Sequence, residues 1–187
     1  VEDRGDGTFS ATPMGQRLRA DHPESLKGMA LHVGTQLAPA FAQLHQCVAL
    51  GRPPEGVKYG PDGFAELNEA PDAAAVFNQS MADNSRRFAA EVAGKQDLSR
   101  YASIIDVGGG YGAVLTTLLR AAPHATGMVL DLAHARAGAE ALFTAEGVAD
   151  RARFVEGSFF EPFASHADAY VLKCILHGWD DAHANRI

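Results

Sequence analysis

The chain has 187 residues, of which 47% are hydrophobic and 21% charged, and its formal net charge is −7. The apolar fraction excludes global disorder, and the acidic balance argues against a nucleic-acid-binding protein, which would need a basic surface. Two cysteines are too few for a disulfide framework and no apolar run reaches membrane-spanning length, so we expect a cytoplasmic protein without a membrane partner.

Residues 1–20 predict a small two-stranded ribbon, because the turn Asp3-Arg4-Gly5-Asp6-Gly7 offers glycines where a hairpin needs positive φ. Residues 21–50 have a helical pattern that ends at Gly51. Its apolar stripe fits a core-facing helix, and consists of Leu37, Phe41, Leu44 and Val48. Residues 51–63 are rich in glycine and proline and predict a loop.

A second long helix is predicted from Pro71 to a stop at Gly94. One face of this helix carries Phe77, Met81, Ser85, Phe88 and Val92. Ser85 is the polar member of that stripe. Its hydroxyl either bonds back to the preceding turn or contacts a ligand.

From residue 99 onward, strands alternate with helices of about a dozen residues, which predicts the α/β class with a parallel sheet covered on both faces. The expected strands are 103–107, 126–132, 151–156 and 167–175, and the expected helices between them are 113–122 and 133–145.

The strongest chemical signal is the run Asp106-Val107-Gly108-Gly109-Gly110-Tyr111-Gly112 at a strand-to-helix junction. Gly108 and Gly110 let the backbone approach a ligand closely, and the spacing also fits a dinucleotide fingerprint. A carboxylate at Asp106 would repel a pyrophosphate but stabilise an ammonium group. The run therefore favours a cofactor with a zwitterionic amino-acid part, while a nicotinamide oxidoreductase stays as the alternative.

Other polar side chains follow the next strands. Asp131 ends the second strand, where it can accept both hydroxyls of a ribose or cap the next helix. Ser158 and Phe159 follow the third strand and could contact a flat ligand ring, although Phe159 and Phe160 fit a plain core equally well.

The fourth strand carries Lys173, which interrupts a buried strand, and leads to His177 on the same rim as the glycine loop. An imidazole there can take a proton from a weakly acidic hydroxyl near neutral pH. Asp180 or Asp181 would cap the following helix. The remaining histidines lack metal-ligand spacing, so we expect no metal site.

With these residues, the chain resembles the metal-independent, S-adenosylmethionine-dependent small-molecule O-methyltransferases, the family of caffeic acid, hydroxyindole and antibiotic-tailoring enzymes. The motifs that carry the resemblance are the Asp106–Gly112 loop, 130–132, 155–160 and 172–181, with the run Phe77-Asn78-Gln79-Ser80-Met81. The resemblance implies a Rossmann-like sheet with strand order 3-2-1-4-5-7-6, of which the first four strands are present. Residues 1–20 would be the wing of a winged-helix dimerisation domain, 21–98 a helical dimerisation and substrate-lining region, and 99–187 a truncated cofactor-binding domain. The chain starts with valine and stops soon after a helix begins, so we expect a fragment of a longer protein.

The resemblance also implies roles for single residues. S-adenosylmethionine, with S-adenosylhomocysteine as product, would contact Ser85, Asp106, Gly108, Gly110, Asp131, Leu132, Ser158, Phe159 and Lys173. A small aromatic hydroxyl compound would contact Phe77, Asn78, Met81, Phe160 and Trp179, with His177 as general base. Two residues depart from the family pattern, because Ser158 and Gly178 stand where the family usually has aspartate. The resemblance further implies a homodimer. A winged-helix DNA regulator and a catalytically inactive cofactor-binding or dimerisation protein stay as alternatives.

Overall fold

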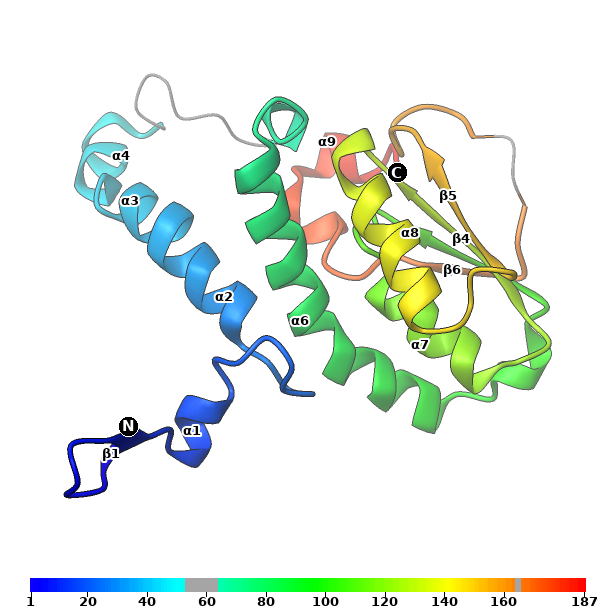
Figure 1. The fold of residues 1–187 in the computed structure, drawn as a ribbon. Coiled ribbons are helices and arrows are strands. Elements are labelled where there is room, and N and C mark those ends of the chain that lie inside the picture. The colour runs from blue at the N-terminus through cyan, green and yellow to red at the C-terminus, as the bar shows by residue number, and fades with distance from the viewer. Residues whose placement is uncertain (53–63, 164–165) are drawn as a thin grey trace.

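The structure is a computed structural model that describes residues 1–52, 64–163 and 166–187. N-terminal helices lie on one side and a four-stranded sheet on the other, with the long helix α6 (Pro71–Lys95) between them (Figure 1). Most of the loop expected at 51–63 lies outside the described residues. In the described part of the chain, no helix combines the length and apolarity needed to cross a membrane.

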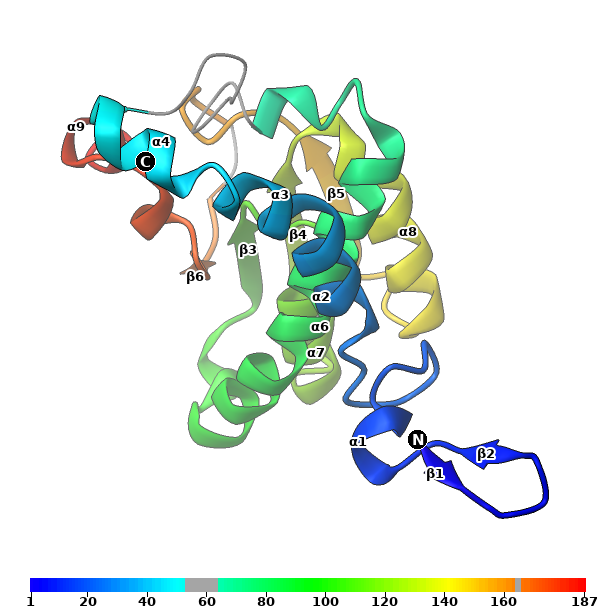
Figure 2. The same ribbon diagram turned by 90° about the vertical axis from the view of Figure 1, so that its left-hand side faces the viewer.

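The predicted ribbon at the N-terminus is confirmed. Strand β1 (Glu2–Asp3) pairs antiparallel with β2 (Phe9–Ser10), and Gly5 and Gly7 in the turn both have positive φ. A short helix α1 (Pro13–Gln16) follows, and the ribbon stands apart from the rest of the chain in both views (Figure 2).

The helix expected over 21–50 is shorter and segmented. It consists of α2 (Lys27–His32), a π-helical turn (Val33–Leu37), α3 (Ala38–Phe41) and α4 (Leu44–Leu50). Pro39 explains the π-helical turn, because proline lacks an amide hydrogen and collides with the carbonyl four residues earlier in a regular helix. The predicted stop at Gly51 is confirmed by its left-handed conformation.

The apolar stripe of these helices points to solvent. Phe41 is 66% exposed and Val48 is 76% exposed. The core-facing interpretation of this stripe is therefore wrong for the described residues. An apolar helix face has to be covered to contribute to stability, and sequence periodicity does not identify what covers it.

Helix α6 ends one residue beyond the predicted stop at Gly94 and packs against both α2 and α7 (Ala113–Ala121). The approach to α2 is close, since a Cβ atom on Gly28 would lie 2.8 Å from the Ser80 nitrogen. The buried Asp83 carboxylate accepts the Gly28 amide at 3.1 Å and stabilises the first turn of α2.

The four strands are all parallel and have the order β5-β4-β3-β6, which confirms the expected start of a Rossmann-like sheet. Their bounds are β3 (Ser103–Val107), β4 (Thr126–Asp131), β5 (Ala152–Glu156) and β6 (Ala169–Val171). Helices α7 and α8 (Arg136–Ala145) follow β3 and β4.

In the described part of the chain, helices cover only one face of the sheet, whereas both faces were predicted to be covered. Side chains of α6, α7 and α8 share one core with Ile104 and Val129. Ile105 and Met128 point to the other face, where described residues from loops, including Phe159 and Phe163, pack against them. The described chain between β5 and β6 forms no helix, so this second face has only loop side chains over it.

The fourth strand is shorter than predicted. β6 ends at Val171, so Lys173 lies beyond the strand and does not interrupt it. Cys174 has φ of 59°, which turns the chain away from the sheet, and β6 pairs in register with β3 at only three positions. An edge strand with a single neighbour is held by fewer hydrogen bonds, which permits this early end.

Candidate cofactor and acceptor site

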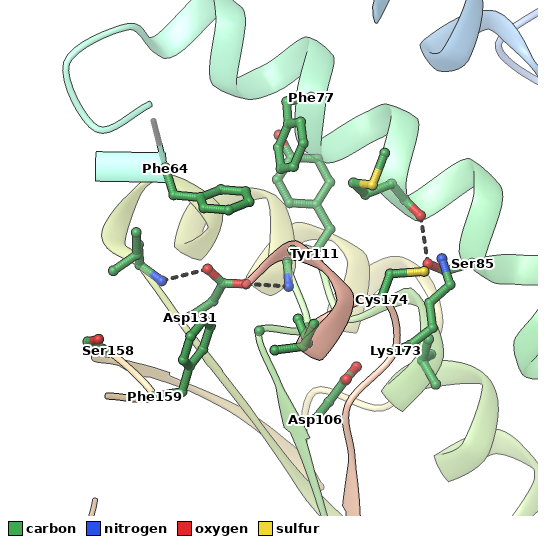
Figure 3. Close-up of a pocket in the computed structure, with 18 of the residues that line it drawn as sticks. Phe64, Phe77, Ser85, Asp106, Tyr111, Asp131, Ser158, Phe159, Lys173 and Cys174 are labelled. Carbon is green, nitrogen blue, oxygen red and sulfur yellow. Dashed lines mark hydrogen bonds between the residues drawn. The ribbon is translucent and has the colours of Figure 1, made fainter. Parts of the chain in front are cut away.

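A cavity of about 440 Å³ opens at the carboxyl ends of the strands, between the sheet and α6 (Figure 3). It brings together almost all the residues singled out from the sequence. The predicted residues that line it are Phe77, Met81, Ser85, Asp106, Gly108, Gly110, Asp131, Leu132, Ser158, Phe159, Phe160, Lys173, His177 and Trp179. Among the predicted residues, Asn78 is missing from the described lining.

The glycine loop forms the floor of the cavity. Gly108, Gly110 and Gly112 all have positive φ, which L side chains rarely adopt. A Cβ atom on Gly108 would lie 2.4 Å from Ile175 Cδ1, so the backbone and the segment after β6 meet here without room for a side chain. The close approach of this loop to a ligand stays a prediction.

Asp106 lies beneath this loop and is 1% exposed. Its Oδ2 atom has no hydrogen-bond partner among the described residues, and a Cβ atom on Gly109 would lie 2.7 Å from it. Burial raises the pKa of this carboxyl group to about 7, and the Asp131 charge adds to the rise. The Leu115 amide and the Lys173 charge oppose the rise. An acid of this kind is half protonated near neutral pH and becomes fully charged when a cation pairs with it.

Asp131 accepts two backbone amides at the end of β4. Its Oδ2 accepts the Gly110 amide at 2.6 Å and its Oδ1 accepts the Leu132 amide at 2.7 Å. Burial raises the pKa of Asp131, and the two amides counteract this. The N-cap of α8 is Ala135, so Asp131 does not cap that helix. Each carboxylate oxygen keeps a second acceptor position for a ligand hydroxyl.

Aromatic side chains form another wall of the cavity. The Trp179 ring is 4.7 Å from the Phe160 ring and 5.8 Å from the Phe159 ring, centroid to centroid. Phe64, which precedes α6, is 5.9 Å from both Trp179 and Phe77. This wall can hold a flat ring through edge and face contacts.

His177 and Lys173 come from the segment after β6. His177 is exposed in the 3-10 turn Leu176–Gly178 and borders the cavity, on the rim expected for it. Lys173 lies on the same side of the cavity as Asp106 and Ser85, whereas Ser158 lies at the opposite side (Figure 3). The predicted cap of the next helix is confirmed, because Asp180 accepts the His183 amide at 2.9 Å.

Two serines of the lining have local bonds. Ser85 Oγ donates to the Met81 carbonyl at 2.6 Å, the helical back-bond that the sequence allowed. Ser158 Oγ accepts the Phe160 amide at 3.2 Å. Both hydroxyls border the cavity and keep acceptor capacity for a ligand.

Sequence reasoning missed several lining residues, among them Phe64, Tyr111 and Cys174. The place of Tyr111 inside the glycine run could have indicated that it lines the site. Phe64 follows the glycine- and proline-rich loop and carries no pattern that indicates a site. Cys174 becomes accessible only because the strand ends before it.

Tyr111 is held over the cavity by Gly138 of α8. A Cβ atom on Gly138 would lie 2.2–2.5 Å from the Tyr111 ring. We therefore expect Gly138→Ala to displace this ring and to destabilise the protein by about 1–3 kcal/mol, measured by urea unfolding. Gly94→Ala is the matched control, since its Cβ meets no described atom within 4 Å, and it should be neutral or slightly stabilising. Equal effects of the two substitutions would contradict the proposed contact.

A glycine loop after β3, an acid at the end of β4 and a cavity over the carboxyl ends of parallel strands define a nucleotide-cofactor-binding domain of the Rossmann type. The family model of the O-methyltransferase domain matches residues 41–187, and the chain belongs to this family.

Similar proteins share about a third of their sequence with this chain. O-demethylpuromycin-O-methyltransferase of Streptomyces alboniger is 34% identical over 98% of this chain and 50% of its own length. Phenazine O-methyltransferase PhzM of Lysobacter antibioticus is 33% identical over 97% of this chain and 53% of its own. The chain thus spans about half the length of these curated relatives.

Solved structures show the same fold. LaPhzM superposes with a TM-score of 0.84 at 32% identity, over 94% of this chain and 53% of that one. The O-methyltransferase NcsB1 from neocarzinostatin biosynthesis, solved with S-adenosylmethionine and 2-hydroxy-5-methyl naphthoic acid, has a TM-score of 0.76 at 31% identity, over 96% and 58% of the two chains.

Proposed function

We propose that this protein transfers a methyl group from S-adenosylmethionine to a hydroxyl group of a small aromatic molecule. The observation that carries the proposal is the buried, unpartnered Oδ2 of Asp106 beside a cavity that also holds Asp131 and His177. A buried carboxyl oxygen without a partner is costly, and a ligand cation is the group that would offset this cost.

The residues present fit the two ends of this cofactor. Asp106 offers a carboxylate to its ammonium group, and Lys173 on the same side offers a cation to its carboxylate. We assign Lys173 to this amino-acid end of the cofactor. Asp131 accepts the ribose hydroxyls, and Ser158 with Phe159 lies where the adenine ring would be held.

The cofactor supplies a methyl group that is already electrophilic, so the protein has to bind, orient and deprotonate the acceptor. The rings of Phe160 and Trp179 hold the flat acceptor and exclude water from its face. His177 takes the hydroxyl proton on its imidazole, which makes the acceptor oxygen nucleophilic.

The names of the relatives support this chemistry. They describe O-methyltransferases of puromycin, phenazine and naphthoate compounds, and NcsB1 was crystallised with both a cofactor and a naphthoic acid. The compounds in these names contain aromatic rings, and the enzymes are named for methylation at oxygen. We infer the same acceptor class for this protein.

Binding of S-adenosylhomocysteine, measured by calorimetry beside NADH, tests the proposal and the nicotinamide alternative together. We expect S-adenosylhomocysteine to bind and NADH not to bind. Asp131→Ala should weaken S-adenosylhomocysteine binding by roughly 10- to 100-fold, because charge-assisted hydrogen bonds are lost. Unchanged affinity in this variant would refute the ribose assignment, and preferential NADH binding would refute the function.

We further propose that the apolar surface of residues 26–50, within the dimerisation region expected over residues 1–98, binds a second copy of this chain. Large apolar side chains are exposed on α2, α3, α4 and the turns beside them, more than a monomer surface usually carries together. They are Leu26, Leu31, Val33, Phe41, Leu44, Val48 and Leu50.

A charge placed on this surface should separate the copies. We expect Phe41→Glu to shift the protein from dimer to monomer in sedimentation velocity, since a charge in an apolar interface stays unpaired. Phe88→Glu on α6, which is also exposed, is the control and should leave the dimer intact. A monomeric wild-type protein at micromolar concentration would contradict the proposal.

A further inference from the structure

Asn78 is the one predicted site residue that the structure turns away from the described cavity lining. It lies on α6, is 2% exposed, and its Nδ2 atom is 2.9 Å from Nδ1 of His134. A buried amide retained on an otherwise apolar helix face needs partners for its donors and its acceptor. Those partners lie in the two segments that form the proposed cofactor site.

The first of these segments is the turn after β4. His134 follows Asp131 by three residues, and its backbone amide donates to Asn68 Oδ1 at 3.1 Å. Asn78 therefore holds this turn through the His134 imidazole, and Asn68 holds it through the His134 backbone amide. The carboxylate of Asp131 sits at the start of the same turn.

The second segment is the glycine loop. A Cβ atom on Gly110 would lie 3.7 Å from Asn78 Oδ1, so the amide packs against the loop at this glycine. The Tyr111 side chain also forms a hydrogen bond with Asn78. Gly110 donates its own amide to Asp131, so one side chain on α6 lies against Gly110 and also contacts His134 in the turn that begins at Asp131.

The hydrogen bond also sets the protonation of His134. An amide nitrogen can only donate, so Nδ1 has to accept, and the ring proton of a neutral imidazole is then on Nε2. Burial lowers the pKa of His134, whereas the nearby Asp131 charge opposes this. A neutral ring leaves Asp131 without a competing cation at its side.

We propose that Asn78 is a positioning residue. Through His134 and the back of Gly110, it holds the Asp131 carboxylate and the glycine loop in the geometry that binds the cofactor. This inference rests on the proposed function and replaces the direct substrate contact that the family resemblance implied for Asn78. It also makes α6 a support of the cofactor site as well as a wall of the cavity.

A double-mutant cycle on cofactor affinity tests the inference, with S-adenosylhomocysteine as the probe. We expect Asn78→Ala and His134→Ala each to weaken binding by about tenfold, and the double variant to weaken it no further than the larger single effect. Ser80→Ala is the control, because Ser80 is equally buried on α6 but contacts Met29 on the side of α2. It should leave affinity unchanged even where it lowers stability.

The wild-type protein offers a second readout that needs no variant. Nitrogen NMR of the imidazoles should show His134 neutral near pH 7, with Nδ1 unprotonated. Wild-type affinity in Asn78→Ala, additive effects in the cycle, or a protonated Nδ1 would each overturn the inference. If Asn78→Ala does not fold, His134→Ala and the NMR measurement decide. Failure of the wild-type protein to bind S-adenosylhomocysteine would overturn the proposed function instead.

Discussion

His177→Ala is expected to lower methyl-transfer turnover by about 10²- to 10⁴-fold, because a positioned general base contributes roughly this much. The imidazole borders the cavity from the turn after β6 and lies outside the glycine loop and the end of β4. Binding of S-adenosylhomocysteine should therefore persist in the variant. Turnover with a phenolic acceptor and calorimetry on the same preparation measure the two effects separately.

A second histidine provides the control for this substitution. His124 is exposed in the turn between α7 and β4. This turn lies at the amino ends of the strands, whereas the cavity lies at their carboxyl ends. His124→Ala should keep full turnover. Unchanged turnover in His177→Ala would remove this imidazole from the mechanism, and a parallel loss of cofactor affinity would assign it a binding role.

The second large effect is expected at Asp106, where one substitution should change binding and stability in opposite directions. Asp106→Asn keeps the shape of the side chain but removes its charge. We expect it to weaken S-adenosylhomocysteine binding by about 10- to 100-fold, since the ammonium group loses a charge-assisted partner. Calorimetry at pH 8, where the wild-type carboxyl is ionised, measures this loss.

The same substitution should stabilise the ligand-free protein. The pKa of Asp106 is about 7 in the folded chain, compared with an ordinary value of 3.8. Between these two values the unfolded chain has released its proton while the folded chain retains it. Stability therefore falls as pH rises, by up to about 4 kcal/mol at pH 7. Urea unfolding should show that the advantage of Asp106→Asn grows from pH 5 to pH 7.5, and a pH-independent difference would contradict the raised pKa.

Cofactor affinity should show the matching pH dependence. The ionised carboxylate binds the ammonium group, so wild-type affinity should rise by about tenfold from pH 6 to pH 8. Asp131 and Lys173 face the same carboxyl group, and Asp106→Asn retains both of them. The difference between the two proteins therefore reports Asp106 itself.

Much of the sheet could be predicted because its signals are local. The runs that form β3 and β4 are largely apolar and short, and they lead into Gly108 and Asp131, a glycine and an acid with a defined role at a strand end. The turn at the glycine loop could be predicted because glycine adopts positive φ readily, and this tolerance depends only on the residue type. The last strand was predicted too long, because an apolar run does not reveal how many hydrogen-bonding neighbours an edge strand has.

The sequence by itself determined which side chains could take part in the chemistry, since residue type and position relative to strand ends depend on the local chain. Asp106, Asp131 and His177 belong to this group, and the structure brings all three to one cavity. Only the tertiary structure decided what each group faces. It left Asp106 Oδ2 buried without a hydrogen-bond partner among the described residues, placed Asn78 against the glycine loop, and exposed the apolar stripe that includes Phe41. The physical reason is that burial and pairing depend on contacts between segments far apart in the chain, and periodicity within one segment carries no information about them.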